Sequence, residues 1–364
     1  MKSSPILSLH KKLGAEIGSF AGWTSPIRFS TVRDEHRTVR TRTGVFDISH
    51  MTRTVVRGEG VVQTLQRTLT CDAASIKEWR MKYCLMLNED AGLIDDVTVL
   101  RVSGDTYLIV SNAVTRGKVV PWLEEHAGSG VNVEDVTEST ALLAVQGPAS
   151  AEVVSRWMGW DASGMKWFSG RVVRVGDCPI VVTRSGYTGE DGFEICILCG
   201  GEEMYENVFE SFLSMGGKPC GLACRDVLRL EAGYPLYGQD IDENVTPVEA
   251  RLMWAIKMEN MSFIGRQALR ERLERGPEKL LVGLELTEPG VPRRGYKVLD
   301  SMGNYVGMIT SGGLSYTTGR GIALGYIPAQ LAVEGARLLV DLRGRVRTAV
   351  VRLEPFVRLN IPKH

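Results

Sequence analysis

The residues best suited to chemistry stand in one glycine-rich stretch, residues 184–194, which reads RSGYTGEDGFE. Glycine accepts positive φ at little cost, so the three glycines predict a tight, repeatedly turning loop. Runs rich in β-forming residues at 179–183 and 193–197 predict that the loop joins two strands. The stretch is therefore either a ligand-binding loop or an ordinary charged β-turn. Its spacing is not that of a phosphate-binding loop, and a strand follows it rather than a helix, which argues against a nucleotide.

A second candidate is the adjacent pair Asp95 and Asp96, at the start of a predicted strand over 97–102. Neighbouring residues of a strand point to opposite faces, so we expect only one of the two to face a pocket. A carboxylate partly shielded from water there could orient an amine or accept its proton. The alternative is a pair of acids in a turn that faces solvent.

The segment 221–233 places Arg225 and Arg229 with two acids on a short apolar helix. This pattern favours either a buried ion-pair network or a ligand site. The five histidines are scattered and predict no Ser/His/Asp set, and no cluster of side chains predicts a metal site. Carboxylates, arginines and tyrosines are instead suited to a flat, hydrogen-bonding heterocycle.

Seven cysteines are an odd number and do not resemble the disulfide framework of a secreted protein. Cys196 and Cys199 have CxxC spacing, but no second pair or nearby histidine completes a metal site. We expect them to be small buried apolar residues. A disulfide would be compatible with a hyperthermophilic source.

The length of 364 residues predicts two or three domains. Lysine plus arginine equals aspartate plus glutamate, 43 against 43, and no basic tail indicates nucleic-acid binding. The N-terminus lacks the apolar segment of a signal peptide, and no apolar run approaches the length of a bilayer span. We therefore expect a cytoplasmic enzyme or binding protein.

Sequential strands with short connections over 52–138 and 139–245 predict antiparallel sheets with helices on one side, an α+β architecture. The charge-dense stretch 33–42 predicts a solvated helix. A charged helix is expected at 264–275. Short strands separated by turns predict a C-terminal barrel or sandwich, at 280–286, 296–299, 305–309, 322–326, 337–342 and 347–353.

Several runs, in this order and spacing, resemble one known family. They are FAGW at 20–23, GVFDISHM at 44–51, LNEDAGLIDD at 87–96, QGP at 146–148, RSGYTGEDGFE at 184–194, RDVLRLEAG at 225–233 and YGQDIDE at 237–243. The family is the aminomethyltransferases, the T-proteins of the glycine cleavage system. The resemblance extends from about Leu9 to Phe356.

The resemblance implies three domains around a central folate channel. They are a discontinuous folate-binding domain (1–51 and 139–245), an inserted α+β domain (52–138) and, after a helical linker (246–279), a C-terminal β-barrel or jelly-roll-like domain (280–364).

It also implies a reaction. The family transfers the one-carbon unit of the aminomethyl group on the lipoyl arm of the H-protein to tetrahydrofolate. The products are 5,10-methylenetetrahydrofolate, ammonia and the dihydrolipoyl H-protein. Tetrahydrofolate is then a co-substrate, the H-protein is the partner, and no metal, nucleic acid or membrane is involved.

Site residues follow from the matching motifs. Asp96 matches the catalytic acid, which raises the nucleophilicity of the folate amines and directs proton transfer. Glu194 matches the acid that recognises the pterin through paired N–H donors. The other folate-site residues implied are Met51, Tyr83, Asn112, Tyr187, Arg225 and Trp254. His50 is expected to be structural, and Glu190 and Asp191 to shape the turn.

Three positions depart from the family pattern. Cys71 replaces an asparagine, Cys224 replaces a small residue such as alanine, and Tyr316 replaces a proline. Two alternative functions stay open: a relative that demethylates another one-carbon donor on folate, and a non-catalytic folate-binding scaffold for iron–sulfur assembly.

Overall fold

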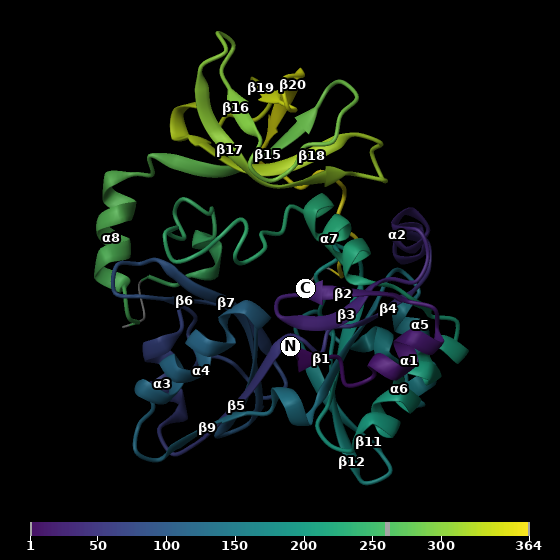
Figure 1. Ribbon diagram of the computed structural model, residues 1–364. Helices are drawn as coiled ribbons and strands as arrows, with labels where there is room; N and C mark the ends of the chain where they lie inside the picture. The colour runs from purple at the N-terminus through teal and green to yellow at the C-terminus, as the bar shows by residue number, and fades with distance from the viewer. Residues whose placement is uncertain (1, 259–262, 363–364) are drawn as a thin grey trace.

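The computed structural model describes residues 2–258 and 263–362, and Figure 1 shows two helix-covered sheets side by side with a barrel across their top. The predicted α+β architecture with a C-terminal barrel is confirmed. Residues 259–262, in the expected linker 246–279, lie outside the described residues, as do 1, 363 and 364. The domain boundaries given above stay a prediction.

The first sheet has six strands, with the order β11-β12-β13-β10-β4-β14. Their bounds are β4 (Gly44–Asp47), β10 (Ala141–Gln146), β11 (Gly170–Val175), β12 (Cys178–Thr183), β13 (Gly192–Ile197) and β14 (Lys218–Pro219). Helices α1 (Leu7–Lys12), α5 (Ser150–Met158) and α6 (Glu202–Ser214) share one apolar core with this sheet. Every residue of β10 is buried, because both faces of the sheet are covered.

The second sheet is antiparallel and has the order β6-β7-β8-β5-β9. Its strands are β5 (Thr52–Gly58), β6 (Met81–Leu87), β7 (Leu93–Ser103), β8 (Thr106–Ser111) and β9 (Val131–Asp135). Helices α3 (Val61–Thr68) and α4 (Arg116–Glu125) share its outer core.

Each sheet has one face that helices cover, and the other faces of the two sheets pack against each other. One apolar cluster joins Leu142 and Val181 of the first sheet to Met81, Leu100 and Leu108 of the second. Side chains that alternate outward from β7 and β13 therefore meet in the space between the sheets.

The C-terminal strands close into a barrel with the order β15-β18-β17-β16-β19-β20. They are β15 (Lys279–Leu286), β16 (Lys297–Leu299), β17 (Tyr305–Leu314), β18 (Gly321–Pro328), β19 (Arg337–Asp341) and β20 (Val346–Arg352), so all six predicted strands are present. Val282, Leu284 and Leu286 alternate into the barrel core, as period two requires. Helix α8 (Arg266–Arg275) precedes the barrel.

The remaining elements connect these units. A small sheet has the order β1-β3-β2, and helix α2 packs against α7. Their bounds are β1 (Lys2–Ser3), β2 (Glu16–Phe20), β3 (Trp23–Arg28), α2 (Val32–Thr41) and α7 (Leu222–Glu231), with short 3-10 turns η1 (Ala113–Thr115), η2 (Thr137–Ser139), η3 (Ala162–Gly164), η4 (Met253–Ala255) and η5 (Ala329–Leu331). In the described part of the chain, no helix is long and apolar enough to cross a membrane.

The prediction that residues 33–42 form a solvated helix is wrong for one face of α2. Glu35, His36 and Val39 are buried. The Glu35 carboxylate accepts hydrogen bonds from the backbone of Phe29 at 2.6 Å and of Gly221 at 2.8 Å. Charged side chains with such partners can be buried, so a polar sequence alone does not identify an exposed face.

Candidate active site

The two adjacent acids of β7 point to opposite faces of the strand, Asp96 toward the first sheet and Asp95 toward Thr115, and are held together by one amide. Asn112 donates through Nδ2 to Oδ1 of Asp95 at 2.7 Å and to Oδ1 of Asp96 at 2.8 Å. The register of β7 with β8 pairs Thr98 with Val110, and its continuation brings Asn112 opposite Asp96. Asp95 is fully buried and Asp96 is only partly exposed, so the alternative of a solvent-facing turn pair is excluded.

The environment of the pair sets its protonation. Burial and the neighbouring charge of Asp96 raise the pKa of Asp95 to about 8, and burial also raises the pKa of Asp96. Thr115 Oγ1 lies 2.6 Å from Asp95 and 2.8 Å from the Asn112 carbonyl. When Thr115 donates to that carbonyl, its oxygen can accept from a protonated Asp95. Burial and the repulsion between the two carboxylates therefore make it harder for both acids to be ionised together than for two free acids.

An aromatic pair borders Asp96. The hydroxyl of Tyr83 donates to Asp96 Oδ2 at 2.9 Å, and the Tyr83 ring stacks on Trp254 with centroids 5.1 Å apart. Burial and the charge of Asp96 raise the pKa of Tyr83 well above its usual value, so it stays a donor. Trp254 is 70% exposed, which gives this site an apolar rim accessible to a ligand ring.

The glycine-rich stretch forms the predicted loop between β12 and β13. Arg184 pairs with Asp191 at 2.6 Å, and Glu190 pairs with Arg40 at 2.9 Å, so these two acids brace the loop. Tyr187 donates to the Pro235 carbonyl. Its pKa is raised by burial and by the charge of Asp96, which indicates that the loop approaches the carboxylate pair.

The sequence of helix α7 favoured either a buried ion-pair network or a ligand site, and the helix contains an ion-pair network and an arginine that is available to a ligand. Arg229 is buried in ion pairs with Asp226 and Asp240, each at 2.8 Å. Arg225, one turn earlier, lies 5.0 Å from the Tyr187 ring, and its Nη1 is buried with no hydrogen-bond partner among the described residues. Burial lowers the pKa of Arg225, an effect that the charge of Glu194 opposes. Arg225 is therefore a guanidinium with an unused donor.

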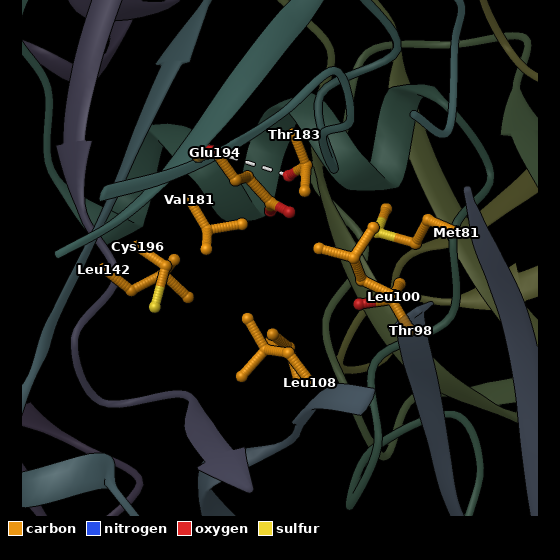
Figure 2. Close-up of a pocket in the computed structure, with 10 residues that line it drawn as sticks. Met81, Thr98, Leu100, Leu108, Leu142, Val181, Thr183, Glu194 and Cys196 are labelled. Carbon is orange, nitrogen blue, oxygen red and sulfur yellow. Dashed lines mark hydrogen bonds between the residues drawn. The ribbon is translucent and has the colours of Figure 1, made fainter. Parts of the chain in front are cut away.

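Glu194 projects from β13 toward the second sheet. Figure 2 shows its carboxylate near Thr183 and directed toward Met81 and Leu100. Its Oε2 accepts from Ser185 at 2.7 Å, and Oε1 has no hydrogen bond in the described residues. The small cavity beside it is lined by the apolar side chains Met81, Leu100, Leu108, Val110, Leu142, Val181 and Cys196 and by the threonines Thr98 and Thr183.

Several of these lining residues were not predicted from the sequence, although their spacing along the strands could have identified them. Thr98 and Leu100 lie two residues apart on β7, as do Glu194 and Cys196 on β13. Period two places each pair on one face, so a prediction of Asp96 and Glu194 as pocket residues also implied their neighbours. Asp95 and Thr115 were not predicted as site residues.

Two other residues lie close to this site. Met51 is partly buried and packs against the core between the sheets. His50 is buried, and burial together with the charge of Arg225 lowers its pKa to about 3. Its ring packs edge-on against Phe20 with centroids 5.2 Å apart, so it is a neutral packing residue near neutral pH.

Four cysteines form disulfides, Cys71 with Cys84 and Cys178 with Cys199. The expectation that Cys199 is only a small apolar residue is therefore wrong, whereas Cys196 is buried and free as expected. The partner of Cys199 lies at the start of the neighbouring strand, 21 residues earlier, which the CxxC spacing could not reveal. The other bond anchors β6, the strand of Tyr83, to the preceding loop.

Comparisons with known proteins agree along the whole chain. Residues 6–260 match the GCVT N-terminal domain model, and residues 279–358 match the model of the glycine cleavage T-protein C-terminal barrel domain. The chain is 40% identical to an aminomethyltransferase of Geobacillus thermodenitrificans (98% of this chain, 99% of the relative) and 40% identical to one of Thermotoga neapolitana (98% of each). It is also similar to the crystal structure of glycine cleavage system aminomethyltransferase T from Bartonella henselae, with a TM-score of 0.93 and 36% identity over 100% of this chain and 99% of that one.

Proposed function

Since this chain belongs to the glycine cleavage T-protein family, we propose that it is an aminomethyltransferase that uses tetrahydrofolate. In this proposal the donor is the aminomethyl group on the lipoyl arm of an H-protein. The donor loses its C–N bond as ammonia leaves and its C–S bond as the lipoyl thiol is released. The methylene carbon forms two new bonds to the folate amine nitrogens.

Asp96 is the proposed catalytic residue. Each folate amine loses a proton as it bonds to the methylene carbon, and each leaving group, the amine and the thiolate, gains one. Asp96 accepts the proton that a folate amine loses and passes a proton to the leaving group. The protons lost and gained are equal in number, so the reaction needs no net acid or base. The observation that carries this role is the partly buried carboxylate itself, held by Tyr83 and Asn112 beside Asp95, whose pKa is raised by burial.

Glu194 and Arg225 are the proposed pterin-recognition residues. A pterin presents paired N–H donors on one edge and a carbonyl acceptor beside them, which match a carboxylate and a guanidinium. The free Glu194 oxygen, beside a small cavity, and the unpartnered Arg225 Nη1 supply these groups. Tyr187 packs on Arg225, and the Tyr83–Trp254 stack offers a surface for the rest of the folate. Met51 is proposed to contact the folate ring from the core between the sheets.

The test is ammonia release from aminomethylated H-protein, measured with and without tetrahydrofolate. We expect folate to stimulate release, and Asp96→Asn to lower turnover about 10²–10⁴-fold with little change in folate affinity. Asp90→Asn, an exposed acid in the connection before β7, is the control and should behave as the unsubstituted enzyme. Absence of folate-stimulated release would overturn the proposed activity, and normal turnover of Asp96→Asn would overturn the role of Asp96 alone.

A further inference from the structure

A basic cleft lies apart from the candidate active site. It is formed by α2, by the turn after β17 and by the C-terminal segment around Arg358, and its volume is about 620 Å³. Pockets for small molecules generally measure about 300–1,000 Å³. The cleft shares no lining residue with the cavity beside Glu194. It is therefore a separate concave site of ligand size.

The cations of this cleft fall into two groups. Arg40 is paired with Glu190 and Glu231, which fixes it in the protein. Arg33 and Arg358 are exposed and make no ion pair or side-chain hydrogen bond within the described residues. Arg37 has only Asp34, one turn away, as its partner. Arg33 and Arg358 thus have no ion pair within the described residues.

The positions of these arginines bring their charges together. Arg33 and Arg37 are four residues apart on α2, so they share one face of the helix. Arg358 comes from the C-terminal segment that forms another wall of the same cleft. Guanidinium groups on two walls of one cleft are well shaped to bind phosphate or carboxylate oxygens.

Tyr316, which replaces the proline usual in the family, completes the cleft. Its ring packs edge-on against His36 at 5.5 Å, and the Arg33 guanidinium lies 5.7 Å from the ring centroid. Tyr316 thereby restricts the position of Arg33 at the rim of the cleft. A proline at this position would provide neither contact.

We propose that this cleft binds a small polyanion that has at least two phosphate or carboxylate groups. One anionic group binds Arg33 and Arg37 on α2, and another binds Arg358 on the C-terminal segment. This site shares no lining residue with the cavity beside Glu194.

The proposal is tested by calorimetric titration of the full chain with two probes, inorganic tripolyphosphate and citrate, at low salt. We expect saturable binding of one equivalent of at least one probe, weakened by added salt. The probe that binds more tightly identifies phosphate or carboxylate as the natural anionic group. Absence of saturable binding of either probe would overturn the proposal.

Substitutions then assign the binding to the cleft. Arg33→Gln and Arg358→Gln should each weaken binding about tenfold or more, because each removes a charged donor pair. Arg270→Gln and Arg272→Gln, exposed on α8 at the opposite side of the molecule in Figure 1, make the same change in charge and should alter the affinity less than twofold. Equal losses of affinity in the cleft variants and the α8 variants would mean that the probe binds to the overall charge of the protein, and would overturn the proposal. Melting temperatures verify that all four variants are folded.

Discussion

The hydrogen bond from Tyr83 to Asp96 gives the sharpest test of the proposed catalytic site. The Tyr83 hydroxyl donates to Asp96 Oδ2 at 2.9 Å, while its ring stacks on Trp254 at 5.1 Å. Tyr83→Phe removes the donor and keeps the stacked ring. Because the hydroxyl stabilises only the ionised carboxylate, its removal should raise the pKa of Asp96.

The size of the shift follows from the strength of such a bond. A hydrogen bond to a charged group contributes about 1.5–3 kcal/mol, and one pKa unit corresponds to about 1.4 kcal/mol. Loss of the Tyr83 donor should therefore raise the pKa of Asp96 by about 1–2 units. Asn112 still donates to Oδ1 at 2.8 Å in the variant, so the carboxylate keeps its position.

The assay is the pH profile of kcat/KM for folate-dependent ammonia release. Asp96 acts as a base only when ionised, so activity falls as the pH drops through its pKa. In Tyr83→Phe this acid limb should move about 1–2 units to higher pH. The control is Tyr205→Phe, which removes a hydroxyl that donates to the Ser139 carbonyl at 2.9 Å, outside this site. An acid limb that stays in place while folate still binds would refute the assignment of that limb to Asp96.

Three further predictions concern recognition and stability. Glu194→Gln should weaken folate binding by about 1–3 kcal/mol, because it leaves a pterin donor poorly paired; titration that finds equal affinity would reject the role of Glu194. Asp95 has a folded-state pKa of about 8, above the unfolded value of 3.8, so the native state holds a proton that the unfolded chain releases. Its contribution to stability should therefore decrease between about pH 4 and pH 8, by up to about 1.4 kcal/mol per unit, and urea unfolding should find a flatter pH dependence in Asp95→Asn. The Cys71–Cys84 bond closes a loop with a sequence separation of 13, and Cys71→Ala should cost about 3 kcal/mol of unfolding free energy under oxidising conditions. A thiol reductant should remove this difference in unfolding free energy between the variant and the parent, and a difference that persists in the reductant would contradict this account.

Features set by local sequence could be predicted well. The six barrel strands are short alternating runs between turns, and five were identified within two residues of their bounds, whereas β17 extends five residues beyond the predicted end at 309. The loop at 184–194 was likewise predicted between two strands, because its glycines and the flanking β-rich runs are adjacent in the chain.

Features set by register could not be predicted. The Asn112 amide reaches Asp95 and Asp96 only because β7 and β8 pair in one particular register. The bond from Tyr83 to Asp96 depends similarly on the pairing of β6 with β7, in which Leu85 lies opposite Asp96. Residue spacing identifies the acids, whereas their protonation depends on these contacts between strands.

The two arginines of α7 illustrate how the same helix combines structure and binding. Burying a guanidinium is costly unless its donors are paired, and Arg229 meets this requirement with Asp226 and Asp240. Arg225 does not, since one of its buried nitrogens has no partner among the described residues and burial lowers its pKa. A ligand acceptor that completed this donor would recover the lost hydrogen-bond energy only in the complex. We therefore infer that α7 is held in place by Arg229, so that Arg225 is kept unpaired for the ligand.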